Sequence, residues 1–176
     1  SGAVYFDVVG AGGHGVTVSA GGLVEIDGRN TAAGAGYESL TLTSVQATNG
    51  SITVYNYENG ITATLVSNTT NANAILLKTE GLSGDIAIDT VSAEGTATVT
   101  FDAIGAISGV DADDDVADIS GGSVVVSSGT SFGASGNTLD LSATDSDITI
   151  SGAVYFDVVG AGGHGVTVSS GGLVEI

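Results

Sequence analysis

The sequence predicts an all-β fold in which the chain winds as a parallel β-solenoid. Short segments of alternating apolar and polar residues, separated by small turn residues, start about every ten residues along much of the chain. Proline is absent, which suits a backbone whose N–H groups nearly all enter hydrogen-bonded ladders. Aromatic residues make up only 5% of the chain, which suits a narrow core filled by Val, Ile, Leu and Ala.

The predicted strands are rich in Val, Ile and Thr, whose β-branched side chains fit a pleated, half-buried surface. Small residues blur the alternation in 96–100 and 123–128, so either face of these two segments could point inward. No segment has a convincing helical period. In chain order the predicted strands cover residues 3–9, 16–19, 23–26, 39–45, 51–57, 61–67, 74–80, 85–91, 96–103, 116–120, 123–128, 138–143, 147–150 and 153–159.

The turns between these strands are supplied mostly by Gly and Asn. Asn49-Gly50, Asn59-Gly60 and Gly121-Gly122 are residues that tolerate the backbone conformations of tight turns. Their short, similar spacing suits the corners of a coil, and about 20–30 residues per coil would give about 5–7 coils in 150 residues. At about 4.8 Å per stacked strand, these coils would advance about 25–35 Å. A tandem-repeat β-sandwich of two antiparallel sheets stays open as the alternative.

The chain contains a long internal repeat. Residues 1–26 return as residues 151–176, and the only difference is Ala20 against Ser170. The sequence therefore predicts one full unit of a tandem array in residues 1–150 and the start of the next unit in residues 151–176. Arrays that grow by copying one unit are typical of proteins built for length or valency.

The charge of the chain excludes several classes of partner. Twenty acidic residues stand against Arg29 and Lys78, which gives a formal net charge of −18. Binding to nucleic acid needs a basic patch, so we expect none. No apolar run approaches the roughly 20 residues that span a membrane, so we expect no membrane insertion. Strong like charge would keep a long polymer soluble and attract divalent cations.

Four segments in the second half of the chain have the character of a known family. They are GDIAI at 84–88, GAISGVDADDDVADIS at 105–120, GTSFGASGNTLDLSA at 129–143 and DITISG at 147–152. Together they resemble giant repetitive bacterial surface exoproteins and adhesins of the filamentous haemagglutinin type. The resemblance implies a right-handed parallel β-helix, export to the cell surface, and a structural or adhesive role. It carries no catalytic residues over to this chain.

An acidic loop is the candidate metal site. Asp111, Asp113 and Asp115 stand at alternate positions, as do the first ligands of an EF-hand loop, and carboxylates so spaced can converge on Ca²⁺. The pattern then departs from that loop, because Val116 occupies the glycine position and Gly122 stands where the bidentate Glu belongs. A solvated acidic loop is the alternative. We expect no required cofactor, with Ca²⁺ as the one candidate.

These observations predict a structural repeat module of a long extracellular filament or cell-surface stalk. Its partner would be itself, because units that stack end to end by strand pairing leave only the ends of the polymer unpaired. The alternative is an adhesive module that binds host cells, surfaces or glycans, with Tyr55 and Tyr57 on one strand face, joined by Tyr37, as its only hint. We do not expect an enzyme, since one Arg and one Lys provide few of the cations that solenoid carbohydrate enzymes use.

Overall fold

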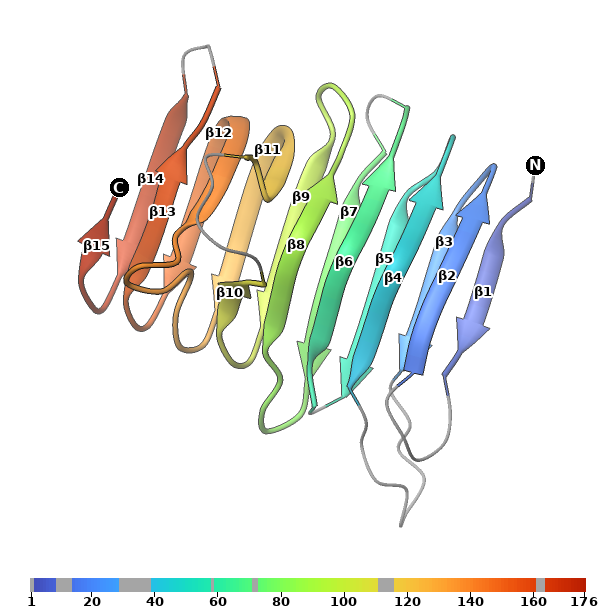
Figure 1. Ribbon diagram of the computed structural model, residues 1–176, viewed down its shortest axis with the longest axis horizontal. Helices are drawn as coiled ribbons and strands as arrows, with labels where there is room; N and C mark the ends of the chain where they lie inside the picture. The colour runs from blue at the N-terminus through green and yellow to red at the C-terminus, as the bar shows by residue number, and fades with distance from the viewer. Residues whose placement is uncertain are drawn as a thin grey trace.

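Strands of successive coils stack in parallel in the computed structural model of the chain, forming a β-solenoid (Figure 1). The structure describes residues 2–8, 14–28, 39–57, 59–70, 73–110, 116–160 and 164–176. Every pair of named strands in these ranges is parallel. The prediction of a β-solenoid is confirmed, and the antiparallel sandwich is not what the chain forms.

The strands follow one another with short connections. In chain order they are β1 (Val4–Asp7), β2 (His14–Ala20), β3 (Val24–Gly28), β4 (Leu40–Ala47), β5 (Ile52–Tyr57), β6 (Ile61–Asn68), β7 (Ile75–Glu80), β8 (Ile86–Ser92), β9 (Thr98–Ala103), β10 (Ile107–Gly109), β11 (Ile119–Ser128), β12 (Leu139–Ile150), β13 (Val154–Val158), β14 (Gly165–Ser170) and β15 (Val174–Glu175).

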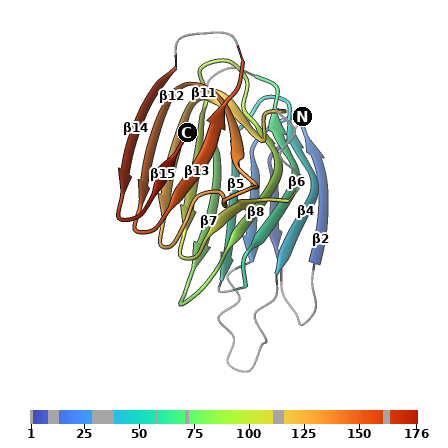
Figure 2. The same ribbon diagram turned by 60° about the vertical axis from the view of Figure 1, so that its left-hand side comes forward.

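The chain alternates between two stacks of strands, which face each other across the core (Figure 2). The first stack runs β1, β3, β5, β7 and β9, then residues 123–128 of β11, residues 145–150 of β12, and β14. The second stack runs β2, β4, β6 and β8, then β10 with residues 119–121 of β11, residues 139–141 of β12, β13 and β15. One coil takes 20 residues from Val4 to Val24 and 28 from Val24 to Ile52.

The core consists of apolar columns between the two stacks. In β5, Ile52 and Val54 are buried whereas Thr53 and Tyr55 are half-buried on the outer face, as alternation requires. The alternation in the sequence left open which face of segments 96–100 and 123–128 points inward. The structure answers this, because Val99 of β9 and Val124 of β11 are both fully buried. The largest fully buried side chains are Phe101, Phe132 and Phe156.

Two predicted breaks between strands do not occur. Residues 119–128 form the single strand β11, which passes through Gly121-Gly122, and residues 139–150 form the single strand β12. The glycines at 121 and 122 serve close packing between coils, since a Cβ on Gly122 would lie 2.4 Å from the Cα of Thr96. The chain therefore moves from one stack to the other inside an extended strand. The short strand β10 was not predicted, because it has only three residues.

Candidate functional site

The two copies of the 26-residue repeat lie at opposite ends of the solenoid (Figure 1). They show the same side chains with and without a preceding coil. Phe6 in β1 is 41% exposed, whereas its copy Phe156 in β13 is fully buried. Val4 is half-buried and its copy Val154 is fully buried. The β1 end of the solenoid is thus an apolar surface that a preceding coil would cover.

At the opposite end of the solenoid, the second copy of the repeat is the exposed one and the first copy is buried. Val24 and Ile26 in β3 are fully buried, because β5 pairs with β3 on its far side. Their copies Val174 and Ile176 are 41% and 64% exposed. Each copy thus shows the neighbour that the other lacks, and in the predicted array the two surfaces would meet at one junction between units. Fully burying one such side chain stabilises a fold by about 1.5–3 kcal/mol.

The junction itself is present inside the chain, where residues 151–176 stack on the coil before them. Residues 139–141 of β12 pair with residues 156–158 of β13, and residues 145–150 of β12 pair with β14. In the segment before β12, the Phe132 N–H donates to the Ala153 carbonyl at 3.1 Å, and the Phe132 carbonyl accepts the Tyr155 N–H at 2.7 Å. The backbone ladder of the solenoid therefore continues from one unit into the next.

An aromatic pair fills the core at this junction. The rings of Phe132 and Phe156 meet edge to face, with centroids 6.2 Å apart and planes at 64°. Such pairs add about 0.5–1.5 kcal/mol to the stabilisation from area burial. Sequence reasoning missed Phe132. The available signal was that the chain has only four Phe, of which Phe6 and Phe156 lie in the two copies of the repeat.

Two glycines allow the close approach of coils at the junction. A Cβ on Gly152 would lie 1.7 Å from the Thr130 carbonyl oxygen, and a Cβ on Gly133 would lie 1.9 Å from the Tyr155 carbonyl oxygen. Gly133 also has a φ of +71°, which side chains disfavour. Gly2, the copy of Gly152, has open space around its Cβ position. A Cβ at position 2 would thus meet nothing, whereas a Cβ at position 152 would meet backbone.

The single difference between the copies lies at Ser170, the last residue of β14. The Ser170 hydroxyl donates to the Gly152 carbonyl at 2.6 Å and accepts the Gly172 N–H at 3.0 Å. Its counterpart Ala20 is 93% buried against the core and pairs with Ala47. Ser170 therefore links the end of β14, through hydrogen bonds, to the residues just before β13 and to the turn before β15.

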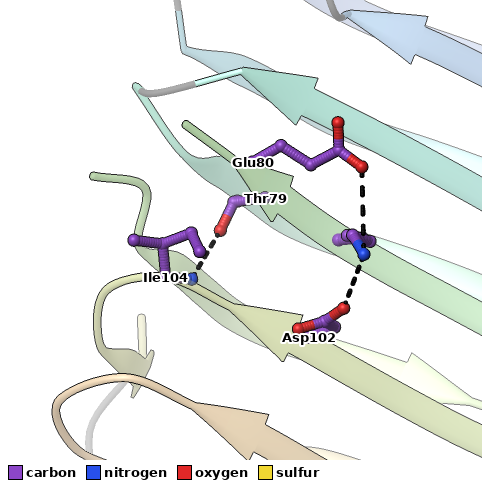
Figure 3. Close-up of polar contacts among 5 residues, drawn as sticks. Thr79, Glu80, Asp102 and Ile104 are labelled. Carbon is purple, nitrogen blue, oxygen red and sulfur yellow. Dashed lines mark hydrogen bonds and ion pairs between the residues drawn. The ribbon is translucent and has the colours of Figure 1, made fainter. Parts of the chain in front are cut away.

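Buried polar side chains hold the corners of successive coils together. The Thr79 hydroxyl donates to the Gly84 carbonyl at 2.8 Å. It also accepts the Ile104 N–H at 3.1 Å (Figure 3). Asn56, its neighbour in register on β5, donates to the Gly60 carbonyl at 2.6 Å. These side chains satisfy backbone groups that leave the strand ladders at the corners.

Lys78 on β7 lies between two carboxylates on the outer face of the first stack (Figure 3). Its ammonium is 2.8 Å from Asp102 on β9 and 3.8 Å from Glu80. The hydrogen bond from Lys78 to Asp102, with the charge of that carboxylate, raises the pKa of Lys78 above its usual 10.5. Tyr55 stands in register with Lys78, and Tyr57 with Glu80. Tyr37, the third tyrosine of the predicted adhesive patch, lies outside the described residues.

The candidate calcium ligands Asp111, Asp113 and Asp115 also lie outside the described residues. Next to them, the buried Asp118 accepts the backbone N–H of Asp140 at 2.9 Å. Within the described ranges, no group of three or more His, Cys, Asp or Glu side chains is placed to hold a metal ion. The calcium site therefore stays a prediction.

The described part of the chain contains no helix long and apolar enough to cross a membrane. In comparisons with protein-family models, curated proteins and solved structures, no match to this chain is found.

Proposed function

We propose that residues 1–150 are one structural repeat module of a long extracellular filament or cell-surface stalk. The observation that supports this most is the complementary exposure of the two repeat copies, Phe6 against Phe156 at one end and Ile26 against Ile176 at the other. A surface that is buried by the neighbouring unit in one copy and open in the other is suited to stacking one unit on the next. The resemblance of residues 84–152 to surface exoproteins supports an extracellular location.

The mechanism is mechanical. Parallel strands of each coil pair with those of the coil before and after, so a stack of units has unpaired strands only at its two ends. The net charge of −18 would keep neighbouring filaments apart in solution. In this proposal the function of the protein depends on the length of the filament and not on turnover of a substrate.

Extending the chain by whole units tests this proposal. Residues 27–176, which are one full period of 150 residues, are added after Ile176 once, twice and three times, and small-angle X-ray scattering measures length and cross-section. The six strand spacings from Val4 to Ser146, with the half-coil from there to Val154, predict an increase of about 31 Å per unit at constant cross-section, at about 4.8 Å per spacing. Units that fold back on each other would thicken the particle instead, and this result would refute the proposal.

A matched pair of variants checks that the junction is responsible. Gly152→Ala in the extended protein should loosen the rod at one joint, because its Cβ meets the Thr130 carbonyl. Gly2→Ala, at the open end, should leave the rod intact. The location is tested separately by immunogold labelling of intact cells that produce the protein, where absence of label on the cell surface would refute an extracellular role.

A further inference from the structure

The two copies of the repeat occupy opposite stacks of the solenoid. Val4 and Val24 belong to the first stack, whereas their copies Val154 and Val174 belong to the second. The first-stack column runs Val4, Val24, Ile52, Ile75, Val99, Val124, Ser146 and Val166. The second-stack column runs Leu40, Ile61, Ile86, Ile107, Phe132, Val154 and Val174.

The same exchange is seen in the second strand of the repeat. Val16 of β2 pairs with Leu42 of β4 in the second stack, whereas its copy Val166 of β14 pairs with Ser146 of β12 in the first stack. The pairing inside the repeat is nevertheless kept, since Val4 pairs with Val24 as Val154 pairs with Val174. The second copy therefore has the same local structure but has turned to the other side of the solenoid.

A half-coil accounts for this exchange. Six steps along the first-stack column lead from Val4 to Ser146, and the chain then crosses to the second stack to reach Val154. One unit of 150 residues thus contains six and a half coils. We infer that successive units of the filament are related by a half-turn about the solenoid axis, combined with a translation of about 31 Å. This inference rests on the proposed function.

The half-turn decides what surface a filament presents. Each side shows the first stack of one unit and then the second stack of the next, so an identical surface returns on one side only after two units, about 62 Å. The Lys78 ion pair would lie on alternate sides in successive units. Any bend that arises from unequal lengths of the two stacks in one unit is reversed in the next, which favours a straight filament.

The 176-residue chain itself tests the half-turn, because it has no Cys and two spin labels can be placed freely. Thr167 on β14 is exposed and shares a first-stack column with Thr53 on β5, five strand spacings or about 24 Å away. Thr64 on β6 is exposed on the second stack. Along the solenoid axis it lies about 22 Å, or about four and a half strand spacings, from Thr167.

Double electron–electron resonance then measures two distances, between Cys variants of Thr53 and Thr167 and of Thr64 and Thr167. The half-turn predicts that the first distance is near 24 Å and shorter than the second, because only the second crosses the solenoid. Equal distances, or the reverse order, would overturn the inference. A whole number of coils would change the length per unit by only about 2 Å, whereas failure of the proposed function would thicken the particle, so the two failures are distinguishable.

The extended protein provides a second measurement. Leu82, at the corner between β7 and β8, is 90% exposed, and Leu82→Cys in each unit accepts a maleimide gold cluster. The half-turn places clusters on alternate edges of the rod, about 62 Å apart along each edge. Clusters about 31 Å apart along a single edge would contradict it.

Discussion

The ring of Phe132 meets the ring of Phe156 edge to face in the core, with centroids 6.2 Å apart. One residue belongs to the first 150-residue unit and the other to the repeated segment that follows it. The contact therefore joins two units across the same kind of core that joins two coils within a unit. Because the copy of Phe156 at the other end is Phe6, the chain provides an internal control for the energy of the junction.

Phe156→Ala should destabilise the end of the solenoid by about 3–5 kcal/mol, the usual cost of removing a fully buried Phe. Phe6→Ala, in the same local sequence but 41% exposed, should cost much less. Urea unfolding with hydrogen exchange measures both variants, in the β12–β14 region for Phe156→Ala and in the β1–β3 region for Phe6→Ala, since an end coil can open without the rest. Equal losses for the two variants would show that the junction adds nothing to the stability of the repeat.

Gly152→Ala should destabilise the chain by more than about 2 kcal/mol, because backbone must move to relieve a Cβ placed 1.7 Å from the Thr130 carbonyl oxygen. Gly2→Ala is its matched control and should be close to neutral, since nothing lies near its Cβ position. Thermal unfolding followed by circular dichroism compares the two. A neutral Gly152→Ala variant would mean that the two coils do not approach as closely as the structure places them.

The strands themselves could largely be predicted from the sequence, but the way units join could not. Alternation gave residues 51–57 and 61–67, and the structure has β5 at Ile52–Tyr57 and β6 at Ile61–Asn68. The half-coil could not be predicted, because coils differ in length and no residue marks where one closes. The partner of Phe156 depends on register, which small and blurred segments leave open.

Thr79→Val should destabilise the solenoid by about 1–3 kcal/mol. The substitution keeps the shape of the side chain but leaves the Gly84 carbonyl and the Ile104 N–H without their hydroxyl partner in a buried corner. Thr53→Val, on the outer face of the neighbouring strand β5, is the control and should change stability by less than about 0.5 kcal/mol. Urea midpoints at constant m-value report the difference, and a neutral Thr79→Val would show that water replaces the hydroxyl.

The ion pair of Lys78 with Asp102 should make stability depend on pH in the alkaline range. The pKa of Lys78 is raised in the folded chain by its hydrogen bond to Asp102, so the stabilisation is fully present below the unfolded pKa near 10.5 and is lost as pH rises through the higher folded pKa. Because both side chains are about one third exposed, we expect less than about 1 kcal/mol. The measurement is the difference in unfolding free energy between the wild-type chain and Lys78→Met, at pH 8 and again above pH 11. This difference should shrink at the higher pH, and a difference that stays constant or grows would show that the pair does not stabilise the fold.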